Sequence, residues 1–236
     1  MLEAIVQNLE DAIEAERVGI DRLELVSCIE RDGLTPSLKT TKEIIEHVKI
    51  PVQVMIRSHA QGFCYSESDV KDMMQSIEQL KSVGANRFVI GGLTAERTID
   101  VQLLDKIITE YPTIEITFHR AFDHAIDVKQ AYLTLIPYKK HIKRILTSGG
   151  APNCLAGVNM LLELVLLSER KNGPLIMPGA GITSDNFASI HKKVQATEYH
   201  FGKGVRLMES FDNTLDRERV LKIKRIWKDL HKDIER

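Results

Sequence analysis

The chain has 236 residues, of which 43% are hydrophobic and 28% are charged, and this composition excludes a largely disordered protein. The formal net charge of −1 provides no overall field that would attract nucleic acid or an anionic membrane, so neither is expected as a partner. No run approaches about 18 apolar residues, and no basic segment precedes Glu10 and Asp11, so neither a membrane-spanning helix nor a signal peptide is predicted.

Short β-forming runs alternate with amphipathic helical runs about eight times along the chain. Strands are predicted at 2–6, 22–26, 52–57, 87–91, 114–119, 143–148, 174–178 and 197–201. Helices are predicted at 9–18, 38–48, 67–83, 100–110, 126–136, 154–171, 184–193 and 214–234. This alternation implies parallel pairing, and the length is close to the roughly 250 residues of an eight-fold barrel. We therefore predict an α/β fold, a single (β/α)8 TIM barrel over residues 1–236.

The connections that follow strands are longer than those that follow helices. The strand-to-helix segments include 27–36, 58–66 and 202–213, whereas the helix-to-strand turns are as short as 19–21 and 84–86. In α/β barrels the strand-to-helix loops build the active site. The functional end is therefore predicted where the strands end.

Strand alternation sorts side chains into a set that faces the helices and a set that faces the barrel interior. In the second strand Leu23 and Leu25 face the helices, which turns Glu24 inward. The same rule turns inward Gln53, Met55, Arg57, Glu115, Thr117, His119 and His200, while the phase of Glu3 is not fixed. Buried ionised groups need partners, so we expect Glu24, together with Glu3, to pair with Arg57 or Arg120. A layer of ion pairs that only stabilises the barrel is the alternative.

The polar residues near strand ends are the candidate catalytic groups. His119 is a candidate general acid or base, Arg57 and Arg120 are candidate anion-binding groups, and Glu24 would hold an arginine in place. His200 is either part of this site or a hydrogen-bonded core histidine.

Glycine-rich segments follow the last three strands. They read Thr147-Ser148-Gly149-Gly150, Pro178-Gly179-Ala180-Gly181 and Gly202-Lys203-Gly204-Val205-Arg206. Backbone N–H groups in such loops can bind an anion, and barrels often place a phosphate between loops seven and eight. Lys203 and Arg206 would add positive charge. The alternative is that these glycines merely turn the chain.

The three cysteines are odd in number and widely spaced, which argues against a disulfide framework and favours a reducing compartment, the cytoplasm. Cys28 and Cys64 fall in long loops after strands, and Cys154 opens the sixth predicted helix. A soft-metal site needs at least two sulfur ligands close together, which Cys28 and Cys64 could supply. Inert packing is the alternative for all three.

Five segments together resemble the CutC family, which is named for copper homeostasis. They are Gly33-Leu34-Thr35-Pro36-Ser37, Phe63-Cys64-Tyr65-Ser66, Thr117-Phe118-His119-Arg120-Ala121-Phe122-Asp123, Leu146-Thr147-Ser148-Gly149 and Gly179-Ala180-Gly181. The resemblance runs from about residue 2 to residue 201. It implies a cytoplasmic TIM barrel that forms homo-oligomers, with copper(I) as a proposed ligand.

Carried over residue by residue, the resemblance supports a polar site made of Glu3, Glu24, Arg57, His119, Arg120, Asp123, Thr147, Ser148 and His200. The positions where family members often carry cysteine hold Ile5 and Val26 in this chain, and Cys28 lies two residues further on. Three functions are therefore weighed: an enzyme acting on a small anionic metabolite, phosphorylated or not; a copper-handling protein; and a binding or scaffold barrel without chemistry.

Overall fold

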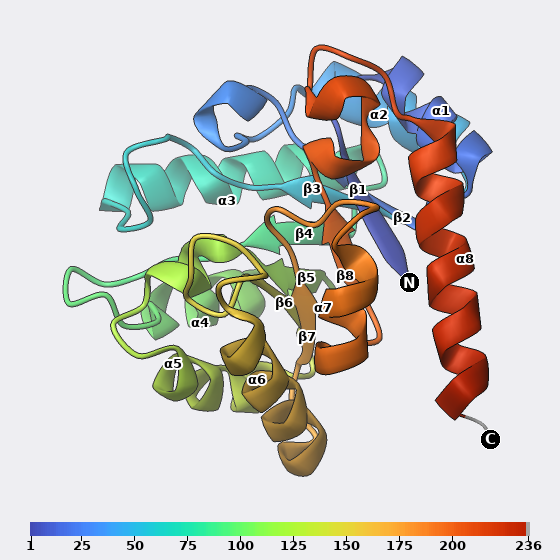
Figure 1. Ribbon diagram of the computed structural model, residues 1–236. Helices are drawn as coiled ribbons and strands as arrows, with labels where there is room; N and C mark the ends of the chain where they lie inside the picture. The colour runs from blue at the N-terminus through green and yellow to red at the C-terminus, as the bar shows by residue number, and fades with distance from the viewer. Residues whose placement is uncertain (235–236) are drawn as a thin grey trace.

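Eight parallel strands form a barrel, and the helices that alternate with them pack around its outside (Figure 1). The computed structural model describes residues 1–234, and the side chains of residues 1–230. The strands are β1 (Leu2–Val6), β2 (Arg22–Leu25), β3 (Val52–Met55), β4 (Arg87–Ile90), β5 (Glu115–Phe118), β6 (Ile142–Thr147), β7 (Leu175–Pro178) and β8 (Tyr199–Phe201). The helices are α1 (Leu9–Val18), α2 (Leu38–His47), α3 (Glu67–Ser82), α4 (Val101–Glu110), α5 (Val128–Leu135), α6 (Val158–Lys171), α7 (Phe187–Val194) and α8 (Arg217–Ile234). The predicted (β/α)8 TIM barrel is confirmed.

The strands are hydrogen-bonded in the order β7-β6-β5-β4-β3-β2-β1-β8, and all of these pairs are parallel. No ladder joins β7 to β8 among the described residues, so side chains close this side of the barrel. Gly179 makes the close approach that this requires, because a Cβ atom added to it would lie 2.4 Å from Leu146 Cδ1 and 3.1 Å from His200 Cβ.

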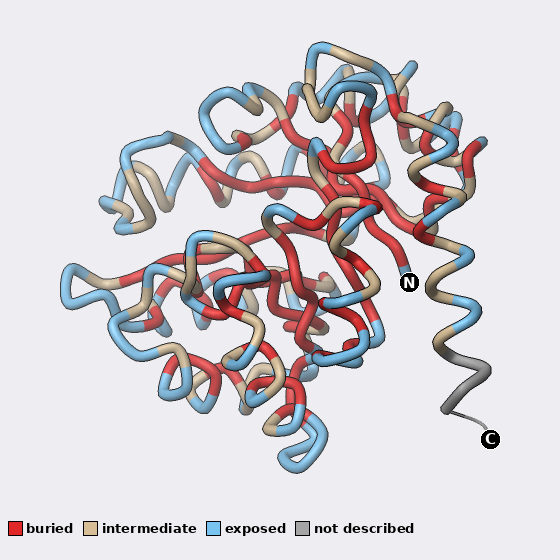
Figure 2. Tube along the Cα trace, in the orientation of Figure 1, coloured by how far each residue is buried: buried red, intermediate tan, exposed pale blue. Residues whose placement is uncertain are grey.

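The strand residues predicted to face the helices lie in the main hydrophobic core. Leu23, Leu25, Val54, Ile116 and Phe118 have no exposed surface, and they pack in one cluster with apolar residues of the helices. Figure 2 shows the consequence: the tube is buried along the strands and alternates between buried and exposed along the helices.

Three helices begin three or more residues later than predicted, at Val158, Phe187 and Arg217 rather than near 154, 184 and 214. The residues before α7 form a capping turn, in which the Thr183 N–H donates to Asn186 Oδ1. The residues before α8 are held by a bridge between Arg206 and Leu215. Each late start adds residues to a strand-to-helix loop, so the end of the barrel where the strands end is larger than the sequence pattern indicated.

Inside the barrel, polar side chains are stacked in levels from the start of the strands to their end. The lowest level contains Arg22, Arg144 and Glu198; the next contains Glu3, Gln53 and Thr117; then follow Glu24 and His200, and finally Ile5, Met55 and His119. Barrel interiors are usually filled by branched apolar residues in such layers. The lower half of this barrel is instead an ion-pair network.

Candidate functional site

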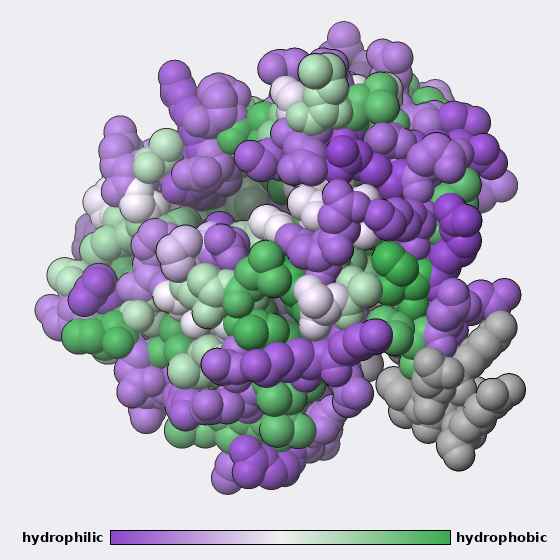
Figure 3. Space-filling model, viewed as in Figure 1, coloured by the Kyte–Doolittle hydropathy of each residue, from purple (hydrophilic) through white to green (hydrophobic). Residues whose placement is uncertain are grey.

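A cavity of about 490 Å³ opens at the end of the barrel where the strands end. Its floor is formed by the two upper interior levels: Ile5, Glu24, Met55, Leu146, His119 and His200. Its walls come from the loops after β2, β3, β5, β7 and β8. In Figure 3 a hollow is visible in this surface, and hydrophilic residues surround much of it. The cavity lies at the end that loop length predicted to be functional.

The floor carries a row of three buried side chains, Glu3, His200 and Glu24. The Glu3 Oε1 atom lies 2.8 Å from His200 Nδ1, and the Glu24 Oε2 atom lies 3.7 Å from His200 Nε2. An ionised Glu3 accepts a hydrogen bond from Nδ1–H, which leaves Nε2 facing Glu24. The second oxygen of Glu24, Oε1, is buried and has no hydrogen-bond partner among the described residues.

The two carboxyl groups of this row have opposite pKa shifts. Burial opposes ionisation of Glu3, but the Arg22 guanidinium and His200 outweigh it and lower the pKa of Glu3 to about 2. Burial likewise disfavours an ionised Glu24, and with only partial compensation from His200 it raises the pKa of Glu24 to about 7. Burial alone would lower the pKa of His200, but Glu24 and Glu3 raise it above its ordinary value. The last two shifts both favour the protonated form, so Glu24 and His200 together hold a proton more strongly than the isolated side chains would.

Arg22 holds this row from below. Its guanidinium donates through Nε to Glu3 Oε2 and through Nη2 to Glu198 Oε2, the latter at 2.8 Å. Arg144 Nε donates to the same Glu198 oxygen at 2.6 Å. Sequence reasoning missed Arg22, although it lies two residues before Glu24 and the same alternation turns it inward. The expected pairing of Glu24 with Arg57 or Arg120 is wrong: the ion-pair partner of Glu24 is His200.

Arg57 does not reach Glu24 because its guanidinium is used above the barrel interior, at the loop after β2. Arg57 Nη1 donates to the backbone carbonyls of residues 31, 32 and 33, at 3.2, 3.2 and 3.4 Å. The same guanidinium lies 4.8 Å above the centre of the Phe63 ring. Arg57 is thus a buried positioning residue that fastens the loop after β2 to the loop after β3 at the cavity wall.

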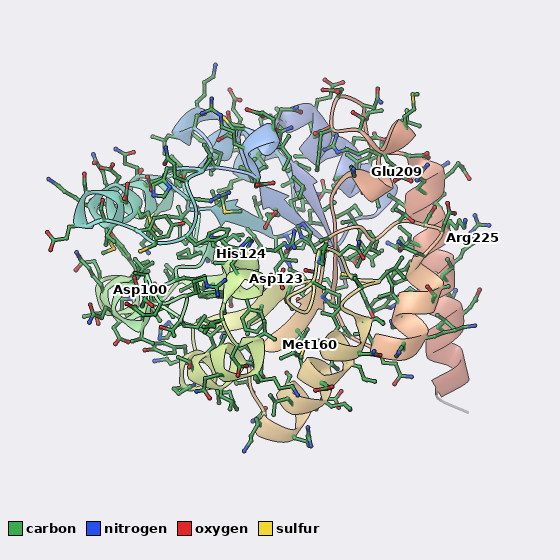
Figure 4. All side chains as sticks on the ribbon, turned by 60° about the vertical axis from the view of Figure 1, so that its left-hand side comes forward. Asp100, Asp123, His124, Met160, Glu209 and Arg225 are labelled. Carbon is green, nitrogen blue, oxygen red and sulfur yellow. The ribbon has the colours of Figure 1, made fainter. Side chains whose placement is uncertain are left out.

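The loop after β5 inserts the Asp123 carboxylate into the loop after β6. Its oxygens accept hydrogen bonds from Thr147 Oγ1, from the Ser148 and Gly150 N–H groups at 3.0 Å, and from Arg120 Nε at 2.8 Å. The Gly149 N–H donates to Thr147 Oγ1. Figure 4 shows Asp123 and His124 near the middle of the molecule, above the strands. The predicted anion cradle of loop six therefore binds a carboxylate of the protein itself.

This arrangement fixes the orientation of the Arg120 side chain. Its Nη2 donates to Ser148 Oγ at 3.0 Å while its Nε pairs with Asp123, so two contacts orient a side chain that is still 39% exposed. It lines the cavity. The role of this cluster at the cavity is therefore to position Arg120 at the rim, through Asp123, Thr147 and Ser148.

The loops after β7 and β8 line the opposite part of the cavity, through 180–183 and 202–204. The N–H groups of Ala180, Gly181, Ile182, Gly202, Lys203 and Gly204 make no hydrogen bond to a described residue. The two loops are in close contact, because a Cβ atom on Gly204 would lie 2.0 Å from the Ile182 carbonyl oxygen. Gly179 is engaged differently, since its N–H donates to the Thr147 carbonyl.

The two cations of the loop after β8 separate in the structure. Lys203 is exposed at the cavity and forms no ion pair with a described residue. Arg206 is buried and points away: it donates to both Asp11 oxygens and to the carbonyls of Ile5 and Asn213. The proposed contribution of Arg206 to an anion site is wrong, because its charge is neutralised by α1.

The sequence model of the CutC family matches residues 1–205. A CutC family protein of Pasteurella multocida (strain Pm70) is 37% identical over 209 residues, which cover 88% of this chain and 84% of that protein. This chain belongs to the CutC family. The copper homeostasis protein cutC homolog of Homo sapiens is 36% identical over 200 residues, or 85% of this chain and 72% of that protein. The crystal structure of CutC from Streptococcus agalactiae has a TM-score of 0.79 at 25% identity and covers 86% of this chain and 97% of its own.

The name of the CutC family raises the question of whether this chain can hold copper. Copper(I) prefers thiolate and thioether ligands. Cys28 and Cys64 are exposed and free, whereas Cys154 is buried and free, and its Sγ donates to the Gly179 carbonyl. Burial raises the pKa of Cys154 to about 12, so it is a neutral thiol. That Cys28 and Cys64 share a metal stays a prediction.

Among the residues whose side chains are described, one group of three has the spacing of metal ligands: Glu3, Glu24 and His200. It offers oxygen and nitrogen atoms, without sulfur, and Glu3 is already neutralised by Arg22. This set of donors does not fit copper(I). Within residues 1–234, moreover, no helix is long and apolar enough to cross a membrane.

The Asp123 cluster of this CutC-family chain gives a first testable expectation. Asp123→Asn removes the charge that three donors and Arg120 share, and hydrogen bonds to a charged group contribute about 1.5–3 kcal/mol. We expect the free energy of unfolding in urea to fall by about 2 kcal/mol. Asp127→Asn is the matched control, since Asn caps a helix as well as Asp and the cap of α5 should survive. Equal stabilities of the two variants would contradict a structural role for Asp123.

Proposed function

We propose that the cavity binds a small anionic metabolite and that Glu24 and His200 transfer a proton to or from it. The observation that carries this proposal is the buried Glu24–His200 pair on the cavity floor, 3.7 Å apart, with Glu24 Oε1 left without a hydrogen-bond partner among the described residues. A general acid or base works best when its pKa is close to the working pH. The pKa of Glu24, raised to about 7, meets that condition, and paired groups with separated pKa values are typical of catalytic sites.

Glu3 would act on this pair as a positioning residue. Its carboxylate fixes the Nδ1–H form of His200 and stabilises the imidazolium ion that forms when Nε2 takes a proton. Arg22 in turn keeps Glu3 ionised. A proton taken from the metabolite can therefore be held by Glu24 or by His200 Nε2 at little cost in free energy, and then returned.

The opposite wall of the cavity supports an anionic ligand. Among the described residues Lys203 at the rim has no ion-pair partner, and backbone N–H groups of loops seven and eight have no hydrogen-bond partner. Arg120 is oriented by Asp123. Such N–H groups together with nearby cations bind phosphate or carboxylate oxygens. A phosphorylated metabolite would place its phosphate against these loops and its reactive part against the floor.

Copper handling is the second candidate function, and its support is the name copper homeostasis protein that the human relative carries. A sulfur site made from Cys28 and Cys64 would lie in the exposed loops after β2 and β3, away from the polar floor. The polar pair on the floor has no role in that function. We therefore favour the enzyme over the copper-handling protein and over an inert barrel.

Phosphate binding tests the proposal. We expect inorganic phosphate to bind the wild-type protein and to raise its melting temperature, because ligands that bind only the folded state stabilise it. Lys203→Glu should raise the phosphate dissociation constant at least about tenfold, since a charge-assisted contact is replaced by repulsion. Lys106→Glu, an exposed change on α4, is the control and should leave the constant unchanged. Absence of binding of phosphate, sulfate and small carboxylates at low ionic strength would overturn the proposal.

A further inference from the structure

The two ring nitrogens of His119 differ in their hydrogen bonding. The Ala121 N–H donates to His119 Nδ1 at 3.1 Å, so Nδ1 is an acceptor and the proton of the neutral ring is on Nε2. That Nε2 atom is buried and has no hydrogen-bond partner among the described residues. A buried donor without an acceptor costs free energy, so the presence of one in a site calls for an explanation.

The ring is kept neutral and in place by its surroundings. Burial, reinforced by the nearby Arg57 charge, lowers the pKa of His119 to about 3. The centre of the Phe63 ring lies 5.1 Å from the centre of the imidazole, and Gly91 leaves space for it, because a Cβ there would be 2.6 Å from Nδ1. His119 is therefore a fixed hydrogen-bond donor rather than a proton carrier.

His119 faces the acid–base pair across the cavity. It follows β5, which is four strands away from β1 in the barrel, whereas Glu24 and His200 come from β2 and β8 on either side of β1. All three side chains line the same cavity. A small molecule on the floor would contact the donor on one side and the proton acceptors on the other.

We propose that His119 donates its Nε2–H to a carbonyl oxygen of the bound metabolite, so that the substrate is an anionic carbonyl compound that loses a proton from the carbon next to the carbonyl. This inference rests on the proposed function and specifies its substrate class. Glu24 or His200 takes the proton, the C–H electron pair forms a carbon–carbon double bond, and the carbonyl π pair moves to the oxygen as an enolate. The His119 N–H stabilises that oxygen, and return of the proton to carbon completes the reaction without a co-reactant.

Two phosphorylated probes that differ in one group test the donor. Dihydroxyacetone phosphate has the carbonyl, and 3-hydroxypropyl phosphate has a methylene in its place. By calorimetry we expect the wild-type protein to bind the carbonyl probe about tenfold more tightly, as one buried hydrogen bond allows. In deuterium oxide the wild-type protein should also catalyse exchange of the probe's protons next to the carbonyl. A histidine with a purely structural role would not affect the rate of this exchange.

Two substitutions separate the two ring nitrogens. His119→Asn keeps an acceptor for the Ala121 N–H and removes the Nε2 donor, so it should abolish the preference and leave 3-hydroxypropyl phosphate binding unchanged. His119→Gln keeps a donor near Nε2 and should retain part of the preference. If His119→Asn does not fold, nitrogen NMR of the wild-type ring provides the test. We expect the neutral Nε2–H form at every pH between 5 and 9, because neutral pH lies about four units above the lowered pKa of His119.

Different results would contradict the proposed role of His119 and the proposed anion site. A preference that survives in His119→Asn, equal wild-type affinity for both probes, or a ring that titrates in that pH range overturns the role of His119, while the anion site stands. Binding of neither probe by the wild-type protein, together with no binding of inorganic phosphate, overturns the anion site and the inference that rests on it.

Discussion

Arg22→Met should lower the free energy of unfolding by about 3–5 kcal/mol, the usual effect of removing one partner from a buried ion pair. Arg22 is 2% exposed and is the cation between Glu3 and Glu198, which it contacts through different guanidinium nitrogens. Without it two carboxylates lose much of their compensation inside the barrel, although Arg144 and His200 stay in contact with them. Urea unfolding at neutral pH measures the change, which is a large part of the about 5–15 kcal/mol that stabilises an ordinary domain.

The same substitution at an exposed arginine is the control. Arg17 pairs with Glu14 on α1, and its side chain is 63% exposed, so Arg17→Met should leave the urea midpoint nearly unchanged. The double variant Arg22→Met/Glu3→Gln should recover part of the loss, because one uncompensated carboxylate is removed along with its partner. Equal stability of Arg22→Met and the wild-type protein would show that the network contributes nothing.

Most of the fold follows from local patterns in the sequence. Period-2 alternation identified Glu24, His119 and His200 as interior residues, and all three line the cavity. Loop length identified the correct end of the barrel. These inferences succeed because side-chain direction in a strand depends on the backbone alone.

Pairing between interior residues could not be predicted in the same way. Which charges meet depends on their level along the barrel axis, and the level is set by the register between strands that are distant in sequence. Glu3 and His200 are opposite each other in the β1–β8 register, although 197 residues separate them. The sequence pattern therefore assigned Glu24 to Arg57 or Arg120, whereas the structure uses both arginines in the loops above the strands.

The composition of the loops was also not enough to predict what they bind. The glycine-rich loop after β6 has the composition of an anion site, and it does bind an anion, but that anion is Asp123 from the neighbouring loop. Arg206 has the position of a phosphate-binding residue and is instead neutralised by Asp11. Composition indicates that a loop can bind negative charge, whereas tertiary contacts decide whether the charge belongs to a ligand or to the protein.

Glu24→Gln should remove a component of the stability that declines between pH 5 and pH 8. Between the ordinary glutamate pKa of 4.5 and the folded-state pKa of about 7, the unfolded chain ionises Glu24 while the folded chain keeps its proton, so stability falls as pH rises. The shift corresponds to about 3 kcal/mol. His200 acts in the same direction, because its pKa is raised: its contribution is complete below the ordinary value of 6.5 and is lost as pH rises past the folded-state value. His119 acts in the opposite direction, because its pKa is lowered to about 3 and its contribution rises with pH up to the ordinary value of 6.5, but this contribution should be the same in the variant and the wild-type protein. The lowered pKa of Glu3 affects stability only at pH values below 4.5, outside this range.

A glutamine at position 24 imitates the protonated acid and does not ionise, so the part of the decline that Glu24 causes disappears. It also removes the main charge that raises the pKa of His200, which reduces the second part. Urea unfolding at pH 5 and pH 8 should therefore show that Glu24→Gln gains stability relative to the wild-type protein as the pH rises. Glu46→Gln, at an exposed position on α2, is the matched control and should retain the wild-type pH dependence. If the stability of Glu24→Gln relative to the wild-type protein is the same at both pH values, then Glu24 is ionised throughout, and the cavity floor does not hold the proton that the proposed mechanism uses.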